Sequence, residues 1–219
     1  VEENIELFAG LYGVTGKRYD ERRRWILEMA ELGDAGDRIT EELPLGWKQR
    51  LALGCAMIHE PPILFLDEPT SGVDPVARRR FWDLINGMSD DGTTVFVSTH
   101  YMEEAEYCHR LALMNRGRLI ALDAPGGLRG RVVDPILNLR TDDAPRAVEA
   151  LQGAEGILDA AMFGRELHVT VEEEEGGAAR VRELLEAAGR SAEDIHTVAP
   201  SLEDVFVSLV RAEGGAREG

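Results

Sequence analysis

The sequence has little cysteine, few aromatic residues and no long apolar run. Two cysteines, Cys55 and Cys108, among 219 residues exclude a disulfide framework or a cysteine-rich zinc cluster and are typical of a reducing compartment. The longest apolar stretches, Leu51–Ile58 and Pro61–Leu66, are far shorter than the roughly 20 residues of a membrane-spanning helix. Because aromatic residues make up only 6%, the core must be mainly aliphatic.

Positive charge is also scarce. There are 24 lysines and arginines against 41 acidic residues, for a net charge of -17. A nucleic-acid-binding surface needs clustered basic side chains, and anionic lipid attracts basic surfaces. The excess of acidic residues therefore predicts no nucleic-acid partner and no direct electrostatic docking on anionic lipid.

The hydrophobic pattern predicts two domains. Residues 1–58 have helical spacing, and two short apolar strands at 63–66 and 94–98 then alternate with helices, which is typical of an α/β domain with a largely parallel sheet. After a glycine- and arginine-rich stretch at 126–133 the pattern becomes βαββαβ plus a final helix, which predicts a small α+β ferredoxin-like domain. We expect an α/β domain over 1–130 (a helical region over 1–58 and a strand core over 59–130), an accessory domain over 131–213 and a disordered tail over 214–219.

The motif with most chemical content is Ile63-Leu64-Phe65-Leu66-Asp67-Glu68-Pro69. A parallel strand buried on both faces delivers its last side chains to the carboxyl edge of the sheet, where α/β folds bind ligands. Asp67 there could hold Mg²⁺ through water, while Glu68 orients and deprotonates an attacking water. Taken alone, the motif fits an ordinary strand end equally well.

Two further motifs add to this edge. Val95–His100 is a second apolar strand that ends in Ser98, Thr99 and His100, so Glu68, Ser98 and His100 should line one edge. Upstream, Leu43–Arg50 opens a helix whose first N–H groups form an anion site. An ordinary Pro-Gly turn before a helix is the alternative for that segment.

Together these motifs resemble the nucleotide-binding domain of ATP-binding-cassette (ABC) proteins over roughly residues 1–130. Leu43–Gln49 stands where that family has its Leu-Ser-Gly-Gly-Gln signature, Ile63–Asp67 looks like the Walker B strand, Ser71–Asp74 like the D-loop, and Glu68 and His100 like the catalytic glutamate and the switch histidine. Within the family, the sequence looks most similar to bacterial ABC-2 type exporters of the multidrug-efflux kind. Pro200–Phe206 looks like the closing helix of that subgroup.

The resemblance implies an ATP hydrolase that uses ATP and Mg²⁺. Two such domains, in a homodimer or in tandem, would sandwich two ATP molecules and drive a permease subunit or fused membrane domain from the cytoplasmic face of the plasma membrane. It assigns the general base to Glu68, the Mg²⁺ ligand through water to Asp67 and the γ-phosphate sensor to His100. The remaining residues expected to contact nucleotide or the domain interface are Gly46, Trp47, Gln49, Ser71 and Asp74.

The sequence departs from the family pattern at the phosphate loop, in the signature and at His109, which stands where the family often has Asp. It contains no Gly-x-x-x-x-Gly-Lys-Ser/Thr phosphate loop, and Val1–Asn4 resembles the segment just after the family's Gln loop. We therefore interpret the chain as the C-terminal portion of an ABC domain, with genuine loss of the loop as the alternative. In the signature, Pro44, Leu45 and Trp47 replace Ser, Gly and Gln, whereas Gly46 is retained.

Two other functions are compatible with the sequence. One is an ABC ATPase that does not transport, and the excess of acidic residues and the Ser201–Phe206 helix weigh against it. The other is a non-catalytic dimerisation or regulatory module, which fits the missing phosphate loop but leaves the Asp67, Glu68 and His100 set unexplained. The transported substrate cannot be predicted from this chain.

Overall fold

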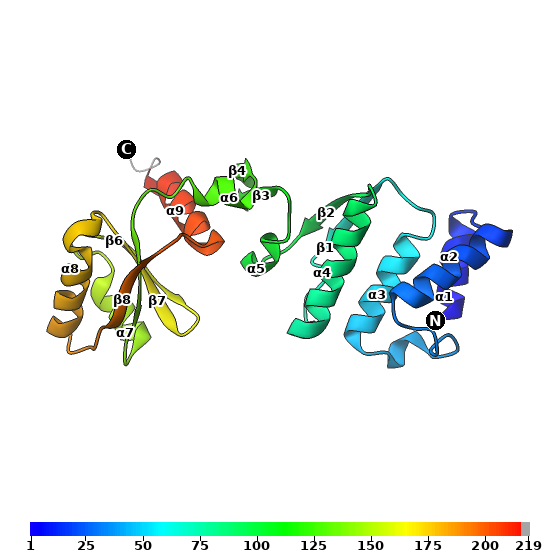
Figure 1. Cartoon of the computed structure of the whole chain (residues 1–219), viewed down its shortest axis with the longest axis horizontal. Coiled ribbons are helices and arrows are strands. Elements are labelled where there is room, and N and C mark those ends of the chain that lie inside the picture. The colour runs from blue at the N-terminus through cyan, green and yellow to red at the C-terminus, as the bar shows by residue number, and fades with distance from the viewer. Residues whose placement is uncertain (216–219) are drawn as a thin grey trace. The chain divides into compact units, whose positions relative to one another are not determined.

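The computed structural model describes residues 1–215, and the chain divides into two units, Val1–Tyr107 and Cys108 onward (Figure 1). The predicted boundary stretch at 126–133 lies inside the second unit, because α6 (Pro125–Arg129) packs against β4 (Arg118–Asp123) and α9 (Leu202–Gly215). The division at residue 130 marks the extent of the family resemblance and stays a prediction.

The first unit begins with a helical region that matches the prediction for residues 1–58. Its elements are α1 (Glu2–Leu11), α2 (Gly16–Met29), the 3₁₀ turn η1 (Thr40–Glu42) and α3 (Leu45–Ala56). A Cβ added at Gly54 would lie 2.6 Å from the Ile26 side chain, so only glycine permits this approach of α3 to α2. Beside it, burial raises the pKa of the Cys55 thiol to about 11, which keeps it a neutral core residue.

A parallel strand pair follows the helices. The elements are β1 (Ile63–Asp67), α4 (Pro75–Asp90), β2 (Thr94–Ser98) and the single turn α5 (Met102–Ala105). Asp67 of β1 pairs in register with Ser98 of β2, so the two strands end side by side. Asp74 is the N-cap of α4, because its carboxylate accepts the Val76 and Ala77 N–H groups, each at 3.0 Å.

One face of this strand pair is open, so the expectation that β1 is buried on both faces is wrong for the described residues. Phe65 is 74% exposed and Phe96 56% exposed, and their rings stack with centroids 5.2 Å apart. On the other face Leu64 is buried, and α4 packs against β2. No element within residues 1–215 covers the aromatic face in its own unit.

The second unit contains the expected ferredoxin-like sandwich. It opens with the hairpin β3 (Leu111–Asn115) and β4, joined by a turn at Arg116 and Gly117, whose φ angles of 49° and 74° suit a tight hairpin. The elements β5 (Ile136–Arg140), α7 (Ala144–Leu151), β6 (Ile157–Phe163), β7 (Glu166–Val171), α8 (Glu174–Ala187) and β8 (Glu193–Val198) follow. The four strands form an antiparallel sheet in the order β6-β7-β5-β8, which confirms the predicted fold.

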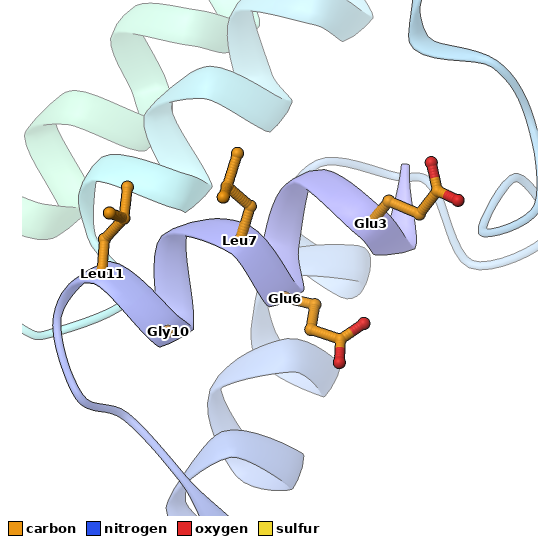
Figure 2. A pocket seen from close by; sticks show the side chains of 5 residues that line it. All are labelled: Glu3, Glu6, Leu7, Gly10 and Leu11. Carbon is orange, nitrogen blue, oxygen red and sulfur yellow. The ribbon is translucent and has the colours of Figure 1, made fainter.

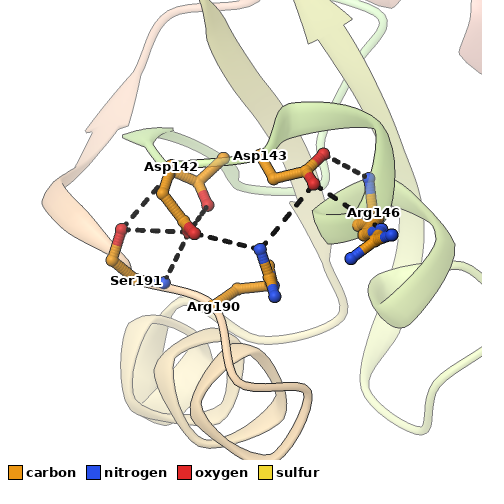
Figure 3. Close-up of polar contacts among 6 residues, drawn as sticks. Asp142, Asp143, Arg146, Arg190 and Ser191 are labelled. Carbon is orange, nitrogen blue, oxygen red and sulfur yellow. Dashed lines mark hydrogen bonds and ion pairs between the residues drawn. The ribbon is translucent and has the colours of Figure 1, made fainter.

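Helices α7 and α8 share one face of this sheet (Figure 1). Their buried residues include Ala147, Leu151, Val181 and Leu185, which form one core cluster with the inward side chains of β5, β6 and β7. The turn before β8 is tied to the start of α7, because Asp142 accepts the Ser191 N–H at 2.9 Å and an Arg190 N–H at 3.0 Å (Figure 3). These contacts, led by the Ser191 N–H, lower the pKa of Asp142.

Helix α9 docks on the opposite face, where His168 of β7 points away from that core. The His168 Nδ1 lies 3.0 Å from both carboxylate oxygens of Asp204 in α9. The helix runs to Gly215, so the first two residues of the expected tail are helical, and 216–219 lie outside the described residues. No helix among residues 1–215 is both long and apolar enough to cross a membrane.

Candidate functional site

The coincident ends of β1 and β2 bring four predicted residues together. The Glu68 N–H donates to both the carbonyl and the hydroxyl oxygen of Ser98, each at 3.0 Å. The Ser98 hydroxyl in turn donates to Asp67 Oδ1. His100 Nδ1 lies 3.3 Å from Glu68 Oε1. The parallel register therefore assembles Asp67, Glu68, Ser98 and His100 at one sheet edge, as the sequence predicts.

The backbone at Glu68 is held in an unusual conformation. Its φ of 42° lies in the left-handed region, which costs a non-glycine residue about 1–3 kcal/mol and tends to persist at functional sites. The two hydrogen bonds from its N–H to Ser98 hold this geometry. The side chains of Glu68 and His100 are each about half exposed, so a ligand can reach both of them.

A second group of predicted residues lies where α3 and α4 begin. The Gln49 side-chain amide donates to the Ser71 carbonyl at 3.4 Å, and the Ser71 N–H donates to the Glu68 carbonyl at 3.1 Å. A Cβ added at Gly46 would lie 3.2 Å from the Ala77 Cβ, so this glycine lets α3 approach the first turn of α4. The loop 68–74 thus connects the signature-like segment to the strand-end site.

Two residues of the signature-like segment, Trp47 and Pro44, make no polar side-chain contact with the loop 68–74. Trp47 is half buried and packs against the helical core of the first unit, so a portion of its ring is already in contact with protein. Pro44 is the N-cap of α3, with φ −54° and ψ 148°, and provides no side-chain capping bond. The predicted nucleotide roles of Gly46, Trp47, Gln49, Ser71 and Asp74 stay predictions.

Sequence analysis missed one charged residue next to the site. Glu104, in α5, is buried and accepts hydrogen bonds from Thr70 and Thr99. The helix α5 is a single turn, Met102–Ala105, and one turn is too short to show a hydrophobic period. The only sequence feature that could have drawn attention to it was its closeness to His100.

Comparison with known proteins identifies the family. A family model described as "ABC transporter" matches residues 1–71. The chain is 52% identical over 131 residues, 60% of its length, to the probable multidrug ABC transporter ATP-binding protein YbhF of Escherichia coli (strain K12), of which it covers 23%. It is 31% identical over 219 residues, 99% of its length, to the daunorubicin resistance ATP-binding protein DrrA3 of Streptomyces coeruleorubidus, of which it covers 69%. The chain belongs to the ABC transporter ATP-binding protein family.

Known structures agree with this membership. A solved structure described as the ATP binding subunit of an ABC transporter matches with a TM-score of 0.53 and 29% identity, over 59% of this chain and 55% of that one. The predicted family and its α/β fold are thereby confirmed, and so is the similarity to ABC proteins named for multidrug transport and drug resistance. This ABC chain spans only a portion of the length of the curated relatives, and its match to DrrA3 runs through both units.

Proposed function

We propose that this ABC-family chain contributes the ATP-hydrolysing site of an exporter of the multidrug-efflux, ABC-2 kind. The observation that carries the proposal is the contact of Glu68 with His100, beside Asp67, at the shared end of two parallel strands. Binding and closure around ATP would be coupled to export through a membrane permease. The chain would then act at the cytoplasmic face of the plasma membrane as a peripheral component.

The Asp67 carboxylate suits an indirect Mg²⁺ contact. Its Oδ1 already accepts the Ser98 hydroxyl, which fixes the carboxylate and leaves Oδ2 for a metal-bound water. Mg²⁺ in nucleotide sites usually takes one or two carboxylates together with water and phosphate oxygens. When bound with ATP, the ion would neutralise charge on the β- and γ-phosphates.

Glu68 and His100 divide the remaining work. Glu68 is the proposed general base that takes the proton of the attacking water, because its carboxylate is accessible and its backbone is pinned to Ser98. His100 is proposed to donate a hydrogen bond to the terminal phosphate. The 3.3 Å contact between the two side chains supports these roles, because a single phosphate and its attacking water would then be close to both.

The partner half of the proposed site would come from a second ABC domain, in a homodimer or in tandem. The free N–H groups at the start of α3, including that of Gly46, would face the partner's ATP, with Trp47 and Gln49 on the same segment. Ser71 and Asp74 would lie near the interface between the two sites. Asp74 also caps α4, so it fixes the loop that the partner domain would meet.

The helical region 1–58 is the proposed contact with the permease. Leu7 and Leu11 lie one turn apart on α1 and are 58% and 70% exposed. Together with Glu3, Glu6 and Gly10 they line a shallow hollow (Figure 2). An apolar hollow flanked by carboxylates fits a partner segment with apolar and basic side chains.

The test of this function compares two forms of the protein. The 219-residue chain has no phosphate loop, so by itself it should hydrolyse ATP at background, because that loop and its lysine supply much of the phosphate binding. In a version of the chain extended at its N-terminus by an ABC phosphate-loop segment, Glu68→Gln should lower kcat by about 10²- to 10⁴-fold, since the amide cannot take a proton. ATP binding, measured by titration with a fluorescent nucleotide, should persist.

The matched control is Asp83→Asn, which removes an exposed carboxylate from α4 and should leave turnover unchanged. Near wild-type turnover in Glu68→Gln would overturn the assignment of the general base. ATP turnover by the 219-residue chain that Glu68→Gln abolishes would instead contradict the need for a phosphate loop.

A further inference from the structure

A buried carboxylate joins the two loops that carry the proposed catalytic residues. Glu104 is 1% exposed. Its Oε2 accepts the Thr99 hydroxyl at 2.7 Å, and its Oε1 accepts the Thr70 hydroxyl. Thr70 is itself 1% exposed and follows Glu68 by two residues, while Thr99 directly precedes His100. One carboxylate therefore bridges the segment after β1 and the segment after β2.

Arg78 of α4 completes the bridge. Its Nε lies 3.3 Å from Glu104 Oε1, and its Nη2 donates to the Val73 carbonyl at 3.5 Å. Its guanidinium carbon lies 4.1 Å from the centroid of the Tyr101 ring. Arg78 thus also contacts both segments, one at Val73 and the other at Tyr101.

The burial of Glu104 restricts the relative positions that the two loops can take. An ionised carboxylate removed from water is tolerated only when hydrogen bonds and an opposite charge replace its hydration. Here two threonine hydroxyls and one guanidinium do so. Movement of either loop would break one of these contacts and leave a buried charge undersatisfied, so the loops are held in one relative position.

The strand pairing alone cannot set this position. The β1–β2 ladder ends at the pair Asp67 and Ser98, and the Glu68 and His100 side chains lie beyond it. We propose that Glu104 is a positioning residue that, by bridging Thr70 and Thr99, fixes the separation of Glu68 and His100. The role of this separation in turnover rests on the function proposed above, whereas the bridging itself does not.

The first experiment measures the bridge in the 219-residue chain. Amide hydrogen exchange is compared for wild type, Glu104→Gln and Glu103→Gln, the last being a matched charge removal at the exposed neighbouring position on α5. The Tyr101 N–H donates to the Thr99 hydroxyl at 3.1 Å. In Glu104→Gln its exchange should speed up by about tenfold or more, as expected when a local structure opens more often. Amides of α2 serve as an internal reference and should not change.

The second experiment measures turnover in the chain extended at its N-terminus by an ABC phosphate-loop segment. Glu104→Gln should lower kcat by about tenfold to a hundredfold with little change in KM for ATP, because a small misplacement of catalytic groups affects mainly the chemical step. Thr70→Val removes one end of the bridge with little change in shape. If both act through one bridge, the double variant should be no slower than the slower single variant.

The outcomes separate the two proposals. If the extended chain without substitutions has no ATPase activity, the proposed function fails, and the exchange measurement still decides the bridging. If Glu104→Gln matches Glu103→Gln in both exchange and kcat, the positioning role is overturned. A parallel loss of melting temperature, nucleotide binding and kcat in both Glu104→Gln and Thr70→Val would also overturn it, since that pattern marks general destabilisation.

Discussion

At the scale of single residues, Pro44 is the feature most at odds with an efficient ABC signature. Proline has neither a hydroxyl nor a backbone N–H, so it cannot donate to a partner's γ-phosphate as serine would. In the chain extended by an ABC phosphate-loop segment, Pro44→Ser should therefore increase ATPase activity or tighten the ATP-bound dimer. The gain of one charge-assisted hydrogen bond, roughly 1.5–3 kcal/mol, corresponds to about tenfold to a hundredfold in the affected step.

The melting temperature of the Pro44→Ser variant is the control for that substitution. The φ of −54° and ψ of 148° at Pro44 are accessible to serine, whose hydroxyl can cap α3 and add about 1 kcal/mol. The loss of proline makes the unfolded chain more flexible and offsets about 0.4–1 kcal/mol of this. The melting temperature should hardly change, so a change in turnover would come from the site. An unchanged or lower rate would mean that the loop is built around proline or does not limit turnover.

The gathering of four polar residues at the strand ends was predictable, because it depends only on where the two apolar runs end in the sequence. Asp67, Glu68, Ser98 and His100 follow two apolar runs, and parallel strands end at one edge. The contribution of Glu104 was not predictable in the same way. A charged residue that is buried by partners at distant positions leaves no hydrophobic pattern, so only the fold shows that Thr70 and Thr99 surround it.

At the scale of elements, the unbroken apolar run Ile63–Leu66 shows what such a pattern does and does not predict. It correctly predicts a strand of the sheet edge that carries the site. It does not predict which residues cover that strand, and Phe65 lies open beside Phe96. A run of apolar residues indicates that a strand is suited to burial on both faces. Whether each face is buried depends on the elements that pack against it.

The docking of α9 permits a prediction about pH. Burial raises the pKa of Asp204, but hydrogen bonds from His168 and Ser201 outweigh it and leave that pKa below its ordinary value. Because the folded-state pKa is the lower one, this contribution to stability is present above about pH 4 and is lost as pH falls through the folded-state pKa. Asp204→Asn should therefore lower the free energy of unfolding at pH 7 by about 1.5–3 kcal/mol.

Urea unfolding of wild type and Asp204→Asn, followed by circular dichroism from pH 7 down to about pH 3, checks this. The difference between the two proteins should shrink at the acid end. The control is Glu183→Gln, which removes a carboxylate that is 70% exposed from the Arg180 ion pair and should cost less than about 0.5 kcal/mol. A difference that does not change with pH would show that Asp204 acts through packing and not through its charge.

At the scale of the whole chain, the predicted domain boundary and the division of the packing depend on different features. The predicted boundary follows composition, since glycines and arginines gather at 126–133. The contacts divide the chain at Tyr107 and Cys108, because α6 packs on β4 and on α9, which comes more than 70 residues later in the sequence. Local composition cannot predict such a long-range contact. The contact affects how much of the chain can fold alone.

The second unit should fold without the first. A fragment from Cys108 to Gly219 keeps the four-stranded sheet, the α7–α8 core and the α6–α9 contact, so it should unfold in one cooperative thermal transition.

A shorter fragment that starts at Val132 lacks α6 and with it the fully buried Leu128. Burial of one leucine contributes roughly 1.5–3 kcal/mol, and about 4–8 °C is lost per kcal/mol in a domain of this size. The shorter fragment should therefore still fold cooperatively but melt at least several degrees lower. Equal melting temperatures would show that α6 adds nothing to α9, and a non-cooperative melt of the longer fragment would show that the second unit needs the first for its core.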